Sequence, residues 1–234
     1  MSKHSTTFST MMTTSSDTRR HNAMARFVTC LLVALAVVIA TPLTEGKKKV
    51  VDIYELSLDE NLVQPEITNQ KHLLRVQDYQ YNTAIDIKNQ NYDVELMRDQ
   101  QVIVVTIPAS QLFDANDTIL TDVGKAVIRP LLKYLANPGF YKMLLVMHSD
   151  NTGSDAYTLG LTRDRVNAVF DWIDEQAGTE FVVPYALGPT EPLVDNNSFE
   201  NRRLNRRLEI YLVPEEVMLD QAKRGNVNIN IVRH

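Results

Sequence analysis

The sequence predicts an α/β domain in which two helices pack on one mixed sheet. Short apolar segments with strand character alternate with segments whose apolar residues recur every three or four positions. Along residues 92–214 the expected order is strand, helix, strand, helix, strand and strand, preceded by a β-hairpin. This order is typical of helices layered on a sheet.

The strands are expected in five places. Residues 92–98, YDVELMR, alternate between apolar and polar side chains, Asp99 and Gln100 can turn, and residues 101–107, QVIVVTI, form a more deeply buried strand. These two segments predict the hairpin. The three later strands are KMLLVMH, EFVVPYAL and RRLEIYLV, at residues 142–148, 180–187 and 206–213.

Two helices are expected from apolar residues at helical spacing. The buried face of the first helix is predicted to contain Leu120, Val123, Val127, Leu131 and Leu135. Pro130 interrupts this pattern, so we expect a kink or a break near Arg129. The second helix is predicted to bury Val166, Val169, Phe170 and Ile173 and to end before Gly178.

Composition limits the classes of function. The chain has 234 residues, 44% of them hydrophobic, and a net charge of −5. Residues 1–40 contribute four basic side chains and one acidic one, so the remainder is more acidic still. An acidic surface argues against nucleic-acid binding, which depends on neutralising phosphates. Cys30 is the only cysteine, so residues 46–234 offer no disulfide or cysteine metal site.

The N-terminal residues 1–45 are interpreted as a polar leader followed by a signal peptide or signal anchor. Arg26 precedes an apolar core at residues 27–40, which has the length of a signal-peptide core and is short for a membrane span. Export is therefore expected, and an uncleaved segment that anchors the protein in the inner membrane is the alternative. Because residues 1–22 are polar and rich in Ser and Thr, Met24 is a second candidate for the start of translation.

Two further regions carry weaker patterns. Residues 46–91 are interpreted as a spacer or a small appendage, with one possible strand at residues 50–58, VVDIYELSL. Residues 215–234 are interpreted as a C-terminal tail.

Three stretches in order resemble the OmpA-like (OmpA/MotB) peptidoglycan-binding domain family of the bacterial cell envelope. They are LFDANDTILTDVG at residues 112–124, HSDNTGSDAYTLGLTRDR at 148–165 and PLVDNNSFENRRLNRRLEI at 192–210. The second is similar to the family's H-T-D-x-x-G segment with an arginine fifteen residues after the aspartate. The third is similar to its closing N-R-R signature. The resemblance covers residues 92–214 and implies the β-α-β-α-β-β sandwich of that family.

The resemblance also implies non-catalytic binding of peptidoglycan through the diaminopimelate of its stem peptide. Asp150 would accept the free ammonium, and the planar guanidinium of Arg165 would hold the carboxylate. The other residues implied at the site are Asn116, Thr158, Asn151, Thr152 and Gly153. Thr158 stands where the family usually has an asparagine. A hydroxyl cannot both donate and accept hydrogen bonds as a side-chain amide does. Neither a catalytic residue nor a metal or cofactor is expected.

The residues themselves leave other readings open. Asp150 could cap its turn, and the arginines at 202, 203, 206 and 207 are expected to have a structural role, pairing with acids such as Glu200 and Glu209. The alternative functions are an envelope protein-interaction domain without the ligand and, less favoured, an enzyme that acts on peptidoglycan with His148 and Asp150 as an acid/base pair. The expected partners are peptidoglycan and outer-membrane or other envelope proteins. The expected location is the periplasm or the outer membrane.

Overall fold

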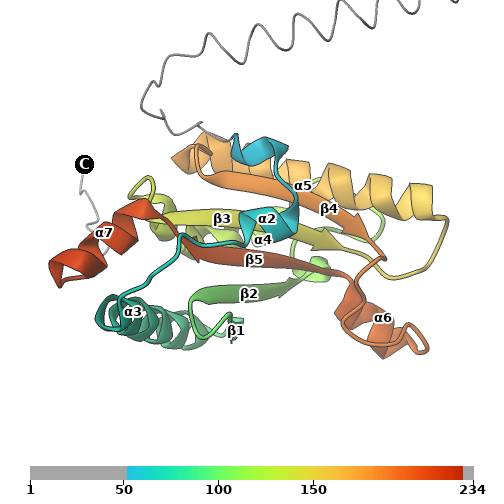
Figure 1. Ribbon diagram of the computed structural model, residues 1–234. Coiled ribbons are helices and arrows are strands. Elements are labelled where there is room, and N and C mark those ends of the chain that lie inside the picture. Colours follow the sequence, from blue (N-terminus) through green and yellow to red (C-terminus); the bar gives the residue numbers. More distant parts are fainter. Residues whose placement is uncertain (1–51, 229–234) are drawn as a thin grey trace, which may run out of the picture. The chain divides into compact units, whose positions relative to one another are not determined.

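The computed structural model describes residues 52–228, which build a five-stranded mixed sheet with helices (Figure 1). The leader and the apolar segment 27–40 lie outside these residues, so the export signal stays a prediction. The strand order is β1-β2-β5-β3-β4. The strands are β1 (Asp93–Met97), β2 (Val102–Pro108), β3 (Tyr141–His148), β4 (Val182–Gly188) and β5 (Arg207–Pro214).

The expected hairpin is present at the edge of this sheet. β1 and β2 pair antiparallel, and Arg98, Asp99 and Gln100 make the turn in left-handed conformations with φ of 49°, 53° and 62°. β5 pairs antiparallel with both β2 and β3, whereas β3 and β4 are parallel. The mixed sheet predicted from the order of the elements is therefore confirmed.

The first expected helix lies between β2 and β3 and is divided in two. α4 (Asp122–Ile128) begins at Thr121, whose side chain accepts a hydrogen bond from the amide of Gly124. A 3-10 helix, η3 (Arg129–Leu135), follows, with Pro130 at its second position, so the predicted break at Arg129 is confirmed. Val123 was expected on the buried face, and this expectation is wrong: it is 67% exposed.

The second expected helix is α5 (Asp155–Ala177), between β3 and β4. Its N-cap is Ser154, and it ends at Gly178 with φ of 77°, as the sequence predicted. Val166, Val169 and Ile173 are buried in the core. Phe170 packs against the core but is only partly buried, so its place in the fully buried stripe was wrong.

Two more helices bury side chains in the same core. α3 (Gln70–Lys88) contributes Val76, Ala84 and Ile87, and α7 (Glu216–Arg224) contributes Met218, Leu219 and Ala222. The two helices contact each other, and the Arg75 guanidinium of α3 donates a hydrogen bond of 2.6 Å to the carbonyl of Ala222. Residues 70–88 and 216–224 therefore pack as parts of the domain.

The opposite face of the sheet is covered by the first described residues. A 3-10 helix, η1 (Ile53–Glu55), and a short helix, α2 (Leu58–Asn61), occupy the place of the strand expected at residues 50–58, which was wrong. Figure 1 shows α2 lying in front of the sheet. Leu62 packs there in a second apolar cluster with side chains of β2, β3 and β5. Tyr185 of β4 donates a hydrogen bond of 2.9 Å to the carbonyl of Leu56 and so fixes this segment.

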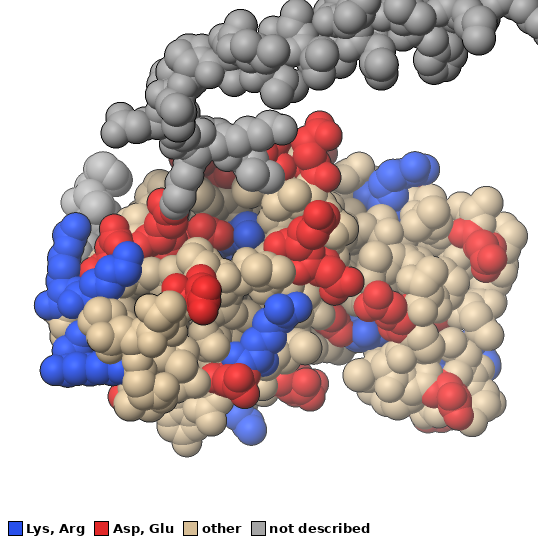
Figure 2. Space-filling view, viewed as in Figure 1, with Lys and Arg blue, Asp and Glu red and all other residues tan. Residues whose placement is uncertain are grey.

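The surface of this face carries mainly acidic charge. Figure 2 shows Asp and Glu side chains spread over it, while Lys and Arg gather at the left, over α7 and the neighbouring end of α3. None of the helices in residues 52–228 combines the length and the apolar character that a membrane crossing needs.

We expect Ile87→Ala to lower the free energy of unfolding by about 2–5 kcal/mol, because Ile87 is fully buried and its loss leaves a cavity. Ile85→Ala is the matched control on the same helix, since Ile85 is 39% exposed and its truncation should cost less than about 1 kcal/mol. Urea unfolding of both variants gives the comparison. Equal, small effects would show that α3 is not packed in the core.

Candidate functional site

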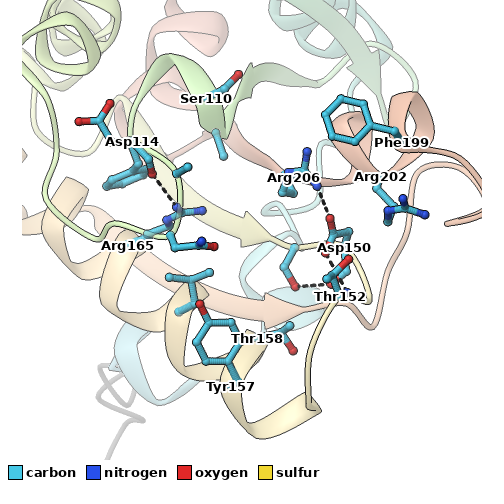
Figure 3. Close-up of a pocket in the computed structure, with 16 residues that line it drawn as sticks. Ser110, Asp114, Asp150, Thr152, Tyr157, Thr158, Arg165, Phe199, Arg202 and Arg206 are labelled. Atoms are coloured by element: carbon cyan, nitrogen blue, oxygen red, sulfur yellow. Dashed lines mark hydrogen bonds and ion pairs between the residues drawn. The ribbon is translucent and has the colours of Figure 1, made fainter.

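A cavity of about 620 Å³ lies where β3 ends and β5 begins. Three segments build its wall: the 3-10 helix η2 (Ala109–Gln111) with the loop that follows it, residues 149–165 from the turn after β3 into α5, and α6 (Phe199–Asn205) with Arg206. Figure 3 shows these side chains facing one another around the open space. The lining residues include three arginines and two aspartates, namely Arg165, Arg202, Arg206, Asp114 and Asp150.

Asp150 is placed by the end of β3. The amide of Ser149 still donates to the carbonyl of Gly188 at 2.8 Å, which extends the pairing of β3 with β4 up to Asp150. The Asp150 side chain is buried, and its Oδ1 accepts a hydrogen bond of 2.9 Å from the amide of Thr152. Its Oδ2 forms an ion pair with the Arg206 guanidinium (Figure 3). Asp150 therefore caps its own turn and also lines the cavity.

Arg165 reaches the same cavity from the third turn of α5. Its Nε donates to the carbonyl of Asp117 at 2.8 Å and its Nη2 to the carbonyl of Asp114 at 3.2 Å. The guanidinium carbon lies 5.0 Å from the centre of the Phe113 ring. Burial lowers the pKa of Arg165, although a guanidinium stays charged at neutral pH. Among the described residues, no Asp or Glu side chain forms an ion pair with Arg165.

Two further expected residues line the cavity. Asn116 is exposed and has a left-handed backbone with φ of 58°, which an asparagine tolerates. Thr158 is 2% exposed, and its hydroxyl is shared between the carbonyls of Ser154 and Asp155, at 3.1 Å each. A hydroxyl has one proton, so Thr158 can only accept a hydrogen bond from a ligand.

The turn after Asp150 is divided between the cavity and the solvent. Thr152 lines the cavity, whereas Asn151 and Gly153 are exposed and lie outside its lining. Gly153 has φ of 113°, and a Cβ there would lie 3.1 Å from Cδ1 of Tyr157. Glycine at this position therefore serves the shape of the turn.

Comparisons with known proteins agree with this fold. No family model matches the chain. It is 30% identical over 108 residues to outer membrane porin F of Pseudomonas aeruginosa, a match that covers 45% of this chain and 31% of the porin. It is also 30% identical over 103 residues to the putative lipoprotein YfiB of Escherichia coli, covering 43% of this chain and 64% of the lipoprotein. The chain thus spans less than two thirds of either relative.

A solved structure shows the same fold. The crystal structure of a putative MotB-like protein from Desulfovibrio vulgaris superposes with a TM-score of 0.55 at 21% identity, covering 62% of this chain and 99% of that one. The chain therefore shares the fold of that MotB-like protein. The fold class expected from the order of helices and strands is confirmed. The resemblance stated for residues 92–214 agrees with the partial similarity to these relatives.

The sequence did not assign Arg202 and Arg206 to this cavity. Arg207 pairs with Glu209 at 2.7 Å, as expected. Arg206, which was also expected to have a structural pairing with such acids, pairs instead with Asp150, and Arg202 lines the cavity beside it. Arg206 ends α6 and Arg207 begins β5, and successive side chains of a strand point to opposite faces. The sequence thus indicates that the two arginines have different partners, without showing which partner each one has.

Aromatic side chains at the cavity were also missed. Phe199 of α6 is 64% exposed and Tyr157 of α5 is 50% exposed, and both line the cavity. The sequence contains no spacing that links the two, because they are brought together only by the fold.

His148 lies behind the cavity, outside its lining. It is buried at the end of β3, and its Nε2 lies 3.3 Å from Oε2 of Glu209. Burial by itself would raise the pKa of Glu209, but the adjacent His148 imidazole, the hydrogen bond from the Tyr211 hydroxyl and the charge of Arg207 lower it to about 2. The arrangement does not bring His148 and Asp150 together as an acid/base pair facing the cavity.

Glu209 should make the domain less stable in acid. Its folded pKa of about 2 lies below the ordinary value of 4.5, so the stability it contributes is present above pH 4.5 and is lost as the pH falls toward 2. We expect Glu209→Gln to cost up to about 3 kcal/mol at pH 7 and roughly half of that or less near pH 3. Urea unfolding at the two pH values measures this. Glu175→Gln, at an exposed position of α5, is the control, and an effect of Glu209→Gln that does not change with pH would contradict the expectation.

Proposed function

We propose that the OmpA-like domain binds peptidoglycan without catalysis and so anchors an envelope component to the cell wall. In this proposal the cavity holds the diaminopimelate of the stem peptide. One observation carries it: Asp150 and Arg165, a buried anion and a buried cation, line the same cavity although fifteen positions separate them in the sequence. A ligand that carries an ammonium and a carboxylate on one carbon matches such a pair.

The charges around the cavity support an anionic group as half of the ligand. Arg165 is held by neutral carbonyl groups, so its charge is solvated by dipoles and is not cancelled by a carboxylate. The lining residues carry one more arginine than aspartates. A ligand carboxylate beside Arg165 would balance that excess, while the ammonium would lie against Asp150.

The names of the relatives support a location in the envelope. One is called an outer membrane porin and another a putative lipoprotein. We place the OmpA-like domain of this chain in the periplasm or at the outer membrane, after export directed by residues 27–40. Retention of that segment would instead anchor the protein in the inner membrane.

A protein-interaction domain without the ligand is the second candidate. Two contacts favour it: Arg206 already neutralises Asp150, and the hydroxyl of Thr158 is already donated to its own helix. Incubation with insoluble cell-wall sacculi distinguishes the candidates. Sedimentation of the protein with intact sacculi supports binding, released muropeptides would indicate an enzyme, and a protein that stays in solution would favour the interaction domain.

We expect Asp150→Asn and Arg165→Lys each to weaken binding of a diaminopimelate-containing stem peptide by about tenfold to a hundredfold. The first keeps the shape of the side chain and removes its charge, and the second keeps the charge and removes the planar fork. Each loses charge-assisted hydrogen bonds worth roughly 1.5–3 kcal/mol. Calorimetric titration of the purified protein measures the affinity.

Neighbouring exposed residues of α5 provide matched controls for these two variants. Asp164→Asn and Arg163→Lys make the same chemical changes at positions that do not line the cavity, and they should bind as the parent does. Undiminished affinity of Asp150→Asn would mean that Asp150 only caps its turn. Because Asp150 also pairs with Arg206, thermal unfolding of each variant must show that it is folded.

Location is tested separately. Protease added to cells whose outer membrane has been opened osmotically should degrade the domain, because export places it outside the inner membrane. Degradation that begins only after the inner membrane is lysed would contradict export.

A further inference from the structure

The Arg206 side chain occupies the position that the proposed function gives to the ligand's ammonium. It forms the ion pair with Oδ2 of Asp150, while Oδ1 is taken by the amide of Thr152. Both oxygens of this carboxylate therefore have partners within the chain. An ammonium that approaches Asp150 must share it with Arg206 or displace Arg206 from it.

The contacts of Arg206 allow its side chain to leave while its backbone stays in place. The amide of Ala109 donates to the Arg206 carbonyl at 2.9 Å, which ties the main chain to the end of β2. The side chain is 33% exposed, and its guanidinium carbon lies 5.9 Å from the centre of the exposed Phe199 ring. Moving the guanidinium within the cavity thus breaks one ion pair and takes the side chain away from an exposed ring.

The free-energy cost of displacing Arg206 depends on which charged groups the ligand carries. A ligand with an ammonium alone would take Asp150 and leave the arginine unpaired beside Arg165, a second cation that lines the same cavity. A ligand with an ammonium and an adjacent carboxylate supplies an anion to the arginine as it supplies a cation to the aspartate. The internal ion pair is then exchanged for two ion pairs with the ligand.

We propose that Arg206 is a specificity-determining residue: an internal counter-ion whose exchange makes the cavity selective for ligands that carry a carboxylate beside their ammonium. This inference rests on the proposed function, because it takes Asp150 as the ammonium acceptor. Arg165 attracts the carboxylate of the ligand. Arg206 adds a second source of selectivity, because it disfavours an amine that has no carboxylate beside it.

The test compares two stem peptides, one with diaminopimelate and one with lysine, which has the side-chain ammonium but lacks the carboxylate beside it. We expect the parent protein to prefer the diaminopimelate peptide. In Arg206→Gln the affinity for the lysine peptide should rise by about threefold to tenfold, because Asp150 is freed from a partly exposed ion pair. The affinity for the diaminopimelate peptide should stay level or fall, so the preference shrinks.

Arg203→Gln is the matched control, because Arg203 is an exposed arginine of α6, just before Arg206 in the sequence, and it does not line the cavity. It should leave both affinities unchanged. An unchanged preference in Arg206→Gln, a proportionate loss for both peptides, or a loss for the diaminopimelate peptide with no gain for the lysine peptide would each overturn the exchange. A parent protein that binds neither peptide would overturn the proposed function, and the exchange with it.

A measurement on the parent protein needs no variant and covers the case in which Arg206→Gln fails to fold. Saturation with the diaminopimelate peptide should shift the guanidinium N–H resonances of Arg206 in the nuclear magnetic resonance spectrum, because the partner of its Nη1 changes from Asp150 to the ligand. The Arg203 resonance should stay in place. An Arg206 resonance that does not move on binding overturns the proposal.

Discussion

The antiparallel pairing of β3 with β5 is the constraint on which the site depends. It places Met147, near the end of one strand, opposite Leu208, near the start of the other. Asp150 follows Met147 and Arg206 precedes Leu208 in the sequence. The strand pairing therefore brings Asp150 and Arg206 together in an ion pair, although 56 positions separate them. Both strands are buried along their whole length, and a shift by one residue would turn every apolar side chain to the wrong face.

The same register supplies the third wall of the cavity. β2 is antiparallel to β5, with Pro108 opposite Arg207, so β2 ends where β5 begins. The loop that follows β2 then lies over the start of α5, and its carbonyls at Asp114 and Asp117 accept the hydrogen bonds of Arg165. The pairing of β5 with β2 and with β3 thus brings three segments that are distant in sequence to one edge of the sheet.

Much of this could be predicted from the sequence, for physical reasons. The strands are runs of apolar residues, which a sequence shows directly. Asp150 and Arg165 belong to one motif, and that motif folds locally as a turn followed by a helix. α3 was missed because its buried face contains Gln80 and Thr83, which interrupt the apolar pattern. Gln80 is satisfied only in the folded chain, where its side chain bonds to Tyr141 and to the carbonyl of Gln101.

The pairing of Arg206 was beyond reach for a related reason. A run of arginines shows how much charge is present but not the direction in which each side chain points, and this direction is set by the change from α6 to β5 between residues 205 and 207. Arg206 turns toward Asp150 and Arg207 turns toward Glu209. The sequence therefore contained both halves of the ion pair without the geometry that joins them.

Arg165 shows most directly that the cavity is not explained by stability alone. Its charge is buried without a carboxylate, a state that costs free energy even when carbonyl groups accept its hydrogen bonds. An apolar side chain on α5 would pack against Phe113 without that cost. The two carbonyls hold the guanidinium in place, and they leave its charge available to an anion that enters from the solvent. The fold thus positions a cation that contributes little to its own stability, and a ligand carboxylate is the group that would make this arrangement favourable.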